Sequence, residues 1–164
     1  MALITSPTDT IPDLNYEYHT ITVDTLGQDS ANTFTCFLNQ PLKNIVQARL
    51  VAARINTTTA TEHCYISIDE LNSTFNDRAS NIYDAQAPLS VLRNSFASLV
   101  TTDDTGIISF RDNYPIAVQY INPIRRIDRL TINIRNEDAV LITPPNPAEN
   151  NFLVLRFVCR KPNL

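Results

Sequence analysis

The most constraining feature of this sequence is a series of short apolar runs in which apolar and polar residues alternate. Such runs occupy residues 16–24, 33–39, 63–69 and 126–135, and clusters of Asn, Asp, Pro and Ser stand between them. A period of two places successive side chains on opposite faces of an extended strand, which suits a sheet with one buried face. No long segment has the apolar spacing of an amphipathic helix. The pattern therefore predicts an all-β protein.

Several other segments fit the same architecture. Residues 115–121 alternate, and residues 152–159 form an almost unbroken apolar run that predicts a terminal strand locked between two neighbours. Residues 95–100 and 106–111 predict a hairpin around the polar stretch 102–105. Residues 45–55 are ambiguous, because their Ala, Leu, Arg and Gln favour a helix whereas their apolar positions also alternate. A short helix near residues 86–93 is an open alternative for the looser middle of the chain.

Eight or nine antiparallel strands in about 150 residues are typical of a single jelly-roll, a two-sheet antiparallel β-sandwich. Regular alternation of strands and helices is absent, which argues against a parallel α/β sheet. We expect residues 1–14 to form an extended N-terminal arm and residues 15–164 to form one jelly-roll domain. The chain has only two glycines, so its turns must rely on Asn, Asp and Pro.

The composition points toward contacts with other proteins. Charged residues make up 18% of the chain, whereas it holds 18 Thr and 17 Asn. Uncharged polar surfaces lose less hydration energy than charged ones when they pack against a neighbour. The formal net charge of −4 argues against sequence-independent binding of nucleic acid. Two basic clusters, interpreted as solvated strand edges or subunit contacts, stand out in the sequence: Arg125, Arg126 and Arg129, and Arg156, Arg160 and Lys161.

The three cysteines suit neither a disulfide framework nor a zinc site. Their number is odd, and Cys36, Cys64 and Cys159 lack the C-x-x-C spacing. We therefore expect each to be a small buried apolar side chain, in a protein that folds in a reducing compartment. The first thirteen residues have neither the basic nor the apolar region of a signal peptide, and no stretch is long enough to span a bilayer. These features predict a soluble protein made in the cytosol.

Residues for catalysis are few. The chain has two histidines, and His63 and Cys64 are neighbours on a strand, so their side chains should point to opposite faces. A pairing of His19 with Cys36 or Cys64 remains a formal alternative for a cysteine-dependent enzyme. We expect no enzymatic activity and no catalytic, cofactor-binding or metal-ligating residues. The acidic pairs Asp103-Asp104 and Glu137-Asp138 are interpreted as solvated turns, with a bound cation as the alternative.

The second half of the chain resembles a known family of proteins. Residues 120–134 read YINPIRRIDRLTINI, a hairpin pattern precedes them, and an acidic turn and a final apolar strand follow. This order resembles the small jelly-roll minor capsid and penton proteins of large icosahedral double-stranded DNA viruses, including giant viruses, and their virophages. In the first half, PLKNIV at residues 41–46 and YISI at residues 65–68 are similar to the opening of such domains. One departure is Ala139, which follows the acidic turn where the family usually has Gly.

The resemblance implies a structural capsid protein, either the penton or a minor capsid (cement) subunit of an icosahedral shell. It implies contacts with the major capsid protein and other minor capsid proteins, a homo-oligomer such as a pentamer, and location in the virion after synthesis in the host cytoplasm. Neither nucleic acid nor direct membrane insertion is expected. The alternative is a carbohydrate- or receptor-binding jelly-roll module, with a pocket near Tyr83, Tyr114 and Asp112.

Overall fold

The protein is all-β in the computed structural model, which describes residues 15–57, 61, 63–71, 95–100, 106–111, 117–136, 140–142 and 150–161. The described part contains seven strands and one turn of 3-10 helix. They are β1 (Tyr16–Asp24), β2 (Thr33–Asn56), β3 (His63–Ile68), η1 (Asp69–Leu71), β4 (Ala97–Val100), β5 (Ile107–Arg111), β6 (Ala117–Asn136) and β7 (Phe152–Arg160). The expected N-terminal arm and the helix near residues 86–93 lie outside the described residues.

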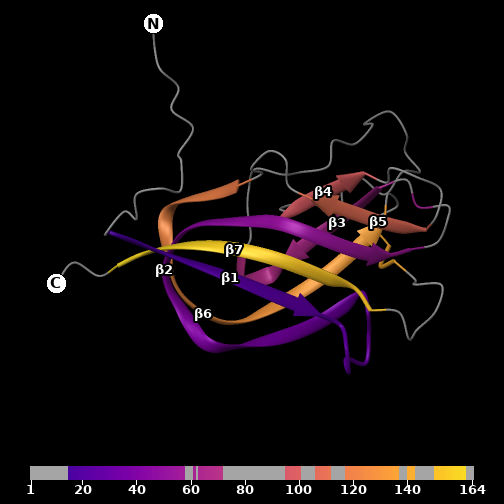
Figure 1. Cartoon of the computed structure of the whole chain (residues 1–164), viewed down its shortest axis with the longest axis horizontal. Coiled ribbons are helices and arrows are strands. Elements are labelled where there is room, and N and C mark those ends of the chain that lie inside the picture. Colours follow the sequence, from indigo (N-terminus) through magenta and orange to yellow (C-terminus); the bar gives the residue numbers. More distant parts are fainter. Residues whose placement is uncertain are drawn as a thin grey trace, which may run out of the picture.

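Two strands are much longer than the sequence pattern predicts. β2 joins the runs at residues 33–39 and 45–55, and it thereby resolves the ambiguous second run as a strand. β6 likewise joins residues 117–121 to the alternating run that follows. Figure 1 shows both strands bending sharply at the same end of the molecule, so that each contributes two limbs. The alternation in the sequence predicts each limb as a separate strand, but it does not predict that each pair of limbs forms one continuous strand through the bend.

The bend coincides with breaks in the β2–β6 pairing. The register shifts between Phe37 and Leu42 and again between Ile45 and Gln47, where extra residues on one strand face fewer on the other. Asn44 lies between these points with a φ of 51°. Bulges increase the local bend and twist of a strand, and Asn tolerates the left-handed conformation better than most residues. The irregular segment thus lets one strand pair in both layers.

The pairing is antiparallel throughout and forms one curled sheet whose limbs face each other. β1 pairs with β7, β7 with the second limb of β2, and this limb with β5. The first limb of β2 pairs with β6, β6 with β3, and β3 with β4. The predicted hairpin is wrong for the described residues, because β4 and β5 pair with different strands in different layers. A curled sheet of this kind is compatible with a β-sandwich.

The core lies between the two layers and follows the alternation of the sequence. In β7 every second residue is buried, and β7 runs between β1 and β2 as predicted. The side chains of Ile45, Leu50, Ile66, Ile132 and Phe157 are at most 1% exposed. Cys64 and Cys159 are buried as expected, whereas the prediction is wrong for Cys36, which is only half-buried.

Asparagine side chains hold together the end of the curled sheet opposite the bend. Asn151 is fully buried, its Oδ1 accepts a hydrogen bond from the Asn56 backbone N–H (2.7 Å), and its Nδ2 donates to the Ala31 carbonyl (2.8 Å). The Asn151 N–H donates to Thr25 Oγ1 (2.9 Å). Buried backbone groups need such partners where the strands end. The expectation that Asn would replace Gly in the connections holds here.

In the described part of the chain, we find no helix with the length and apolar character needed to cross a bilayer.

Candidate interaction surface

A groove runs between β1 and the first limb of β2, which belong to different layers. It has a volume of about 800 Å³, and residues 18–24 and 35–40 supply most of its walls. In the described pairings, β1 bonds only to β7, and residues 33–37 of β2 bond only to β6. Both walls are therefore sheet edges that present backbone N–H and C=O groups on one side. Edges of this kind are ready templates for pairing with another chain.

Three large apolar side chains lie along this groove. Phe37 is 77% exposed, Leu26 is 78% exposed and Tyr18 is 51% exposed. The guanidinium of Arg156 lies 5.3 Å from the centre of the Tyr18 ring, which fixes one side of the tyrosine. Scattered apolar residues are common on surfaces, whereas three of them border one open groove here, which makes the groove the candidate interaction surface.

The groove also brings together His19 and Cys36, the alternative catalytic pair. Cys36 Sγ hydrogen-bonds to the Asp24 carbonyl (3.9 Å), and His19 Nε2 lies 3.5 Å from a Glu17 carboxylate oxygen. Burial, and to a lesser degree the charge of Asp24, raises the pKa of the Cys36 thiol. A catalytic cysteine needs the opposite shift, because the thiolate is the nucleophile. The direction of this shift therefore does not support Cys36 as a nucleophile activated by His19.

The combinations that involve Cys64 find no support, because this cysteine faces the core. Cys64 is fully buried, while His63 is half-buried and packs edge-on against Tyr65, with 5.2 Å between the ring centres. The predicted opposite facing of His63 and Cys64 is confirmed. The pairing of His19 with Cys64 finds no support either, because Cys64 faces the core.

Other sequence candidates fall outside the residues that the structure describes. These are Asp103-Asp104, Glu137-Asp138, Tyr83, Tyr114 and Asp112. Within the described ranges, no group of three or more His, Cys, Asp and Glu side chains has the arrangement of a metal site.

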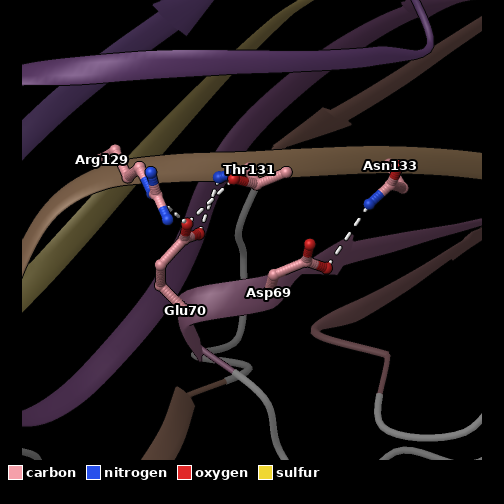
Figure 2. A network of polar contacts seen from close by, with 5 residues as sticks. All are labelled: Asp69, Glu70, Arg129, Thr131 and Asn133. Carbon is pink, nitrogen blue, oxygen red and sulfur yellow. Dashed lines mark hydrogen bonds and ion pairs between the residues drawn. The ribbon is translucent and has the colours of Figure 1, made fainter.

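A polar network that the sequence did not reveal covers the outer side of β6 (Figure 2). β3 stops pairing with β6 at Ile68, and η1 follows directly. Glu70 then accepts hydrogen bonds from the Thr131 backbone N–H (2.7 Å) and from Thr131 Oγ1 (2.9 Å). Its carboxylate also lies 3.6 Å from Arg129 Nε. The Glu70 side chain therefore continues, with its own oxygens, the edge pairing that β3 leaves incomplete.

The two basic clusters of the sequence lie in different surroundings in the fold. Arg129 pairs with Glu70, and Arg126 lies 3.7 Å from Asp128. Arg156 and Arg160 lie on β7, where Arg156 pairs in register with Arg49 of β2. No sequence signal singles out Arg49, because only the register of two distant strands makes it a neighbour of Arg156.

None of the protein-family models matches this chain, and neither does any of the curated proteins compared with it.

Proposed function

We propose that this protein is a structural subunit of an icosahedral viral shell, a penton or minor capsid (cement) protein, and that it acts through protein–protein contacts. The resemblance of residues 120–134 to such proteins motivates the viral assignment. The groove between β1 and the first limb of β2 is the observation that carries the assembly role.

The proposal includes a jelly-roll fold, and the order of pairing supports it. Dividing β2 at its bend, and counting β6 by its second limb, gives eight strands along the chain. The first of these then pairs with the eighth, the second with the seventh, the third with the sixth and the fourth with the fifth. The eighth also pairs with the third, and the seventh with the fourth. A ribbon rolled into two Greek keys produces this nesting.

The groove suits an extended segment of a neighbouring subunit. Its two walls offer backbone hydrogen-bonding groups, which an added strand can satisfy, and Phe37, Leu26 and Tyr18 offer apolar area. Phe37 stands on an edge strand with most of its ring in water, where it adds little to the stability of a single subunit. Burial in a contact would recover about 2 kcal/mol for such a side chain.

In this role the protein requires no cofactor and performs no catalysis. Its partners would be the major capsid protein, other minor capsid proteins and further copies of itself, and its location would be the virion. The domain division, an arm at residues 1–14 followed by one jelly-roll domain at residues 15–164, is part of the same proposal.

The test is the assembly state of the purified full chain, alone and mixed with the major capsid protein of the same virus. Sedimentation velocity should show a ring of five for a penton, or co-sedimentation with the major capsid protein for a cement subunit. Phe37→Ser should abolish that association and leave the unfolding midpoint unchanged. Val100→Ser is the matched control, since Val100 is 73% exposed on β4, away from the groove.

The proposal would be overturned if the chain sediments as a monomer and does not bind the major capsid protein. A glycan-array signal that Phe37→Ser removes would replace it with the carbohydrate-binding alternative.

A further inference from the structure

The two layers of the sandwich have chemically different outer faces. In the layer formed by β1, β7, the second limb of β2 and β5, the registers place Arg49 opposite Arg156 and Arg54 opposite Ser109. Leu50, Leu155 and Ile108 at the alternate positions are buried, so these arginines face outward. We call this outer surface the basic face.

The basic face combines cations from three strands, β2, β5 and β7. Its outward register positions hold Arg49, Arg54, Arg111, Arg156 and Arg160. Among the residues that the structure describes, Asp24 at the end of β1 is the one acidic residue at an outward position of this face. At the bend, Lys43 pairs in register with Arg126 next to the buried pair Leu42 and Ile127. A protein with a net charge of −4 thus concentrates much of its positive charge on one side.

The registers bring like charges together on this face. Arg49 lies directly opposite Arg156, and Lys43 lies opposite Arg126, which is also 3.7 Å from Asp128. Cations on adjacent strands raise the local positive potential, and an anionic surface is attracted to such a potential.

Exposed apolar side chains border the cations on the same face. Ile121 of β6 is 90% exposed, and it alternates with Val118 and Tyr120, which point inward. Tyr18 pairs in register with Val158, whose neighbours Phe157 and Cys159 are buried, so Tyr18 also faces outward. Ile121 and Tyr18 therefore stand at opposite sides of the sheet with arginines between them.

The outer face of the other layer is less basic, because its arginines are Arg129 and Arg135, although the exposed Phe37 also lies on it. Its register positions on β2, β6 and β3 include Thr33, Thr35, Thr131, Asn133 and Ser67. Arg129, on that side, is paired with the Glu70 carboxylate. The two faces thus provide an internal comparison within one molecule.

We propose that the basic face docks peripherally on a membrane surface that contains anionic phospholipids. Arginine binds phosphate groups in a bidentate manner, and each Lys or Arg near such a surface strengthens adsorption. A broad sheet face matches a flat bilayer, and Tyr18 and Ile121 enter the headgroup region while the arginines contact phosphates. Nucleic acid would use the same cations, but it would leave the nearly fully exposed Ile121 without a role.

The net negative charge of the chain does not oppose this docking. Packed layers of a sandwich lie about 10 Å apart, and the Debye length at physiological ionic strength is about 8 Å. Charges on the far side of the molecule are therefore largely screened from the membrane. The local charge of the basic face determines the interaction.

The test is co-sedimentation of the full chain with vesicles of phosphatidylcholine containing 30% phosphatidylserine, with pure phosphatidylcholine vesicles alongside. We expect binding to the anionic vesicles only, and its loss at high salt. Arg160→Gln should weaken partitioning about fivefold, and the triple variant Arg54→Gln, Arg111→Gln, Arg160→Gln about 100-fold. Ile121→Ser should also weaken it at unchanged charge.

Arg129→Gln is the matched control, because it removes the same charge from the other face. Its partitioning should stay within about twofold of the natural chain. Circular dichroism and sedimentation of each variant verify an unchanged fold and assembly state, which separates this test from that of the capsid role. Equal losses for Arg129→Gln and Arg160→Gln, or binding of a 30-base-pair DNA without binding of vesicles, would overturn the proposal.

Discussion

Replacement of Glu70 by Ala removes the side chain that completes the edge of β6 (Figure 2). The change deletes two hydrogen bonds, to the backbone N–H and the hydroxyl of Thr131, and the ion pair with Arg129. The Glu70 side chain is only 18% exposed, so water replaces these contacts poorly.

The magnitude follows from the kind of bond that is lost. A hydrogen bond from a backbone N–H to a charged group contributes about 1.5–3 kcal/mol, whereas an ion pair with an exposed arginine contributes about 0.2–1 kcal/mol. The Arg129 side chain is 59% exposed, so the Thr131 bonds should dominate. We expect Glu70→Ala to lower the free energy of unfolding by about 2 kcal/mol, and Arg129→Gln by about 0.5 kcal/mol.

Urea denaturation with an unchanged m-value measures this loss. Thermal unfolding of a chain of this size should show a decrease in Tm of about 4–8 °C for Glu70→Ala. Asp69→Ala is the control on the same turn, since Asp69 is exposed and its bond to Asn133 is long at 3.5 Å. It should cost less than about 0.5 kcal/mol.

Two results would refute the reasoning. A cost below about 0.5 kcal/mol for Glu70→Ala would mean that the Thr131 N–H finds another partner. Equal costs for Arg129→Gln and Glu70→Ala would mean that the ion pair, and not the backbone bond, holds η1 against β6.

Three further perturbations test other parts of the fold. Asn151→Ala should cost about 1–3 kcal/mol in urea denaturation, because it leaves the buried Asn56 N–H and the half-buried Ala31 carbonyl without their partner; a neutral result would contradict the network. Asn44→Ala should cost about 1–2 kcal/mol at its φ of 51°, whereas Asn44→Gly should be nearly neutral; equal costs would show that the backbone there adopts another conformation. The thiol of Cys36 should react with iodoacetamide more slowly than in the urea-unfolded chain, because burial raises its pKa. Because the folded pKa of this thiol exceeds the unfolded one, its contribution to stability is complete below the unfolded pKa and is lost as the pH rises through the folded pKa. Cys36→Ser should reduce this pH dependence, and the remaining part includes Cys159, whose pKa burial also raises.

Local sequence pattern predicted the strands well because burial selects it residue by residue. Ile66 and Ile68 of β3 are buried, with the half-buried Ser67 between them, as the alternation requires. The same pattern failed between β4 and β5, since alternation shows which face of a strand is buried and not which strand lies beside it. It also missed the continuity of β2, because Asn44 and Pro41 read as turn residues in sequence, although the chain bends there without leaving the sheet.

The candidate surfaces depended more strongly on the tertiary structure. Sequence reasoning named His19 and Cys36, which do share a groove, but it gave no indication of Phe37, because an aromatic residue in an apolar run reads as core. The sequence also gave no indication of the role of Glu70, because that role depends on where β3 stops pairing with β6.

What the sequence determined by itself is the class of structure: strands, their buried positions and connections made with asparagine instead of glycine. These follow from local rules of side-chain direction and backbone hydrogen bonding. The tertiary structure alone decided that Arg49 meets Arg156, that Lys43 meets Arg126, and that Phe37 borders an open groove. The physical reason is that strand pairing joins residues about 100 positions apart, and no local pattern encodes that register.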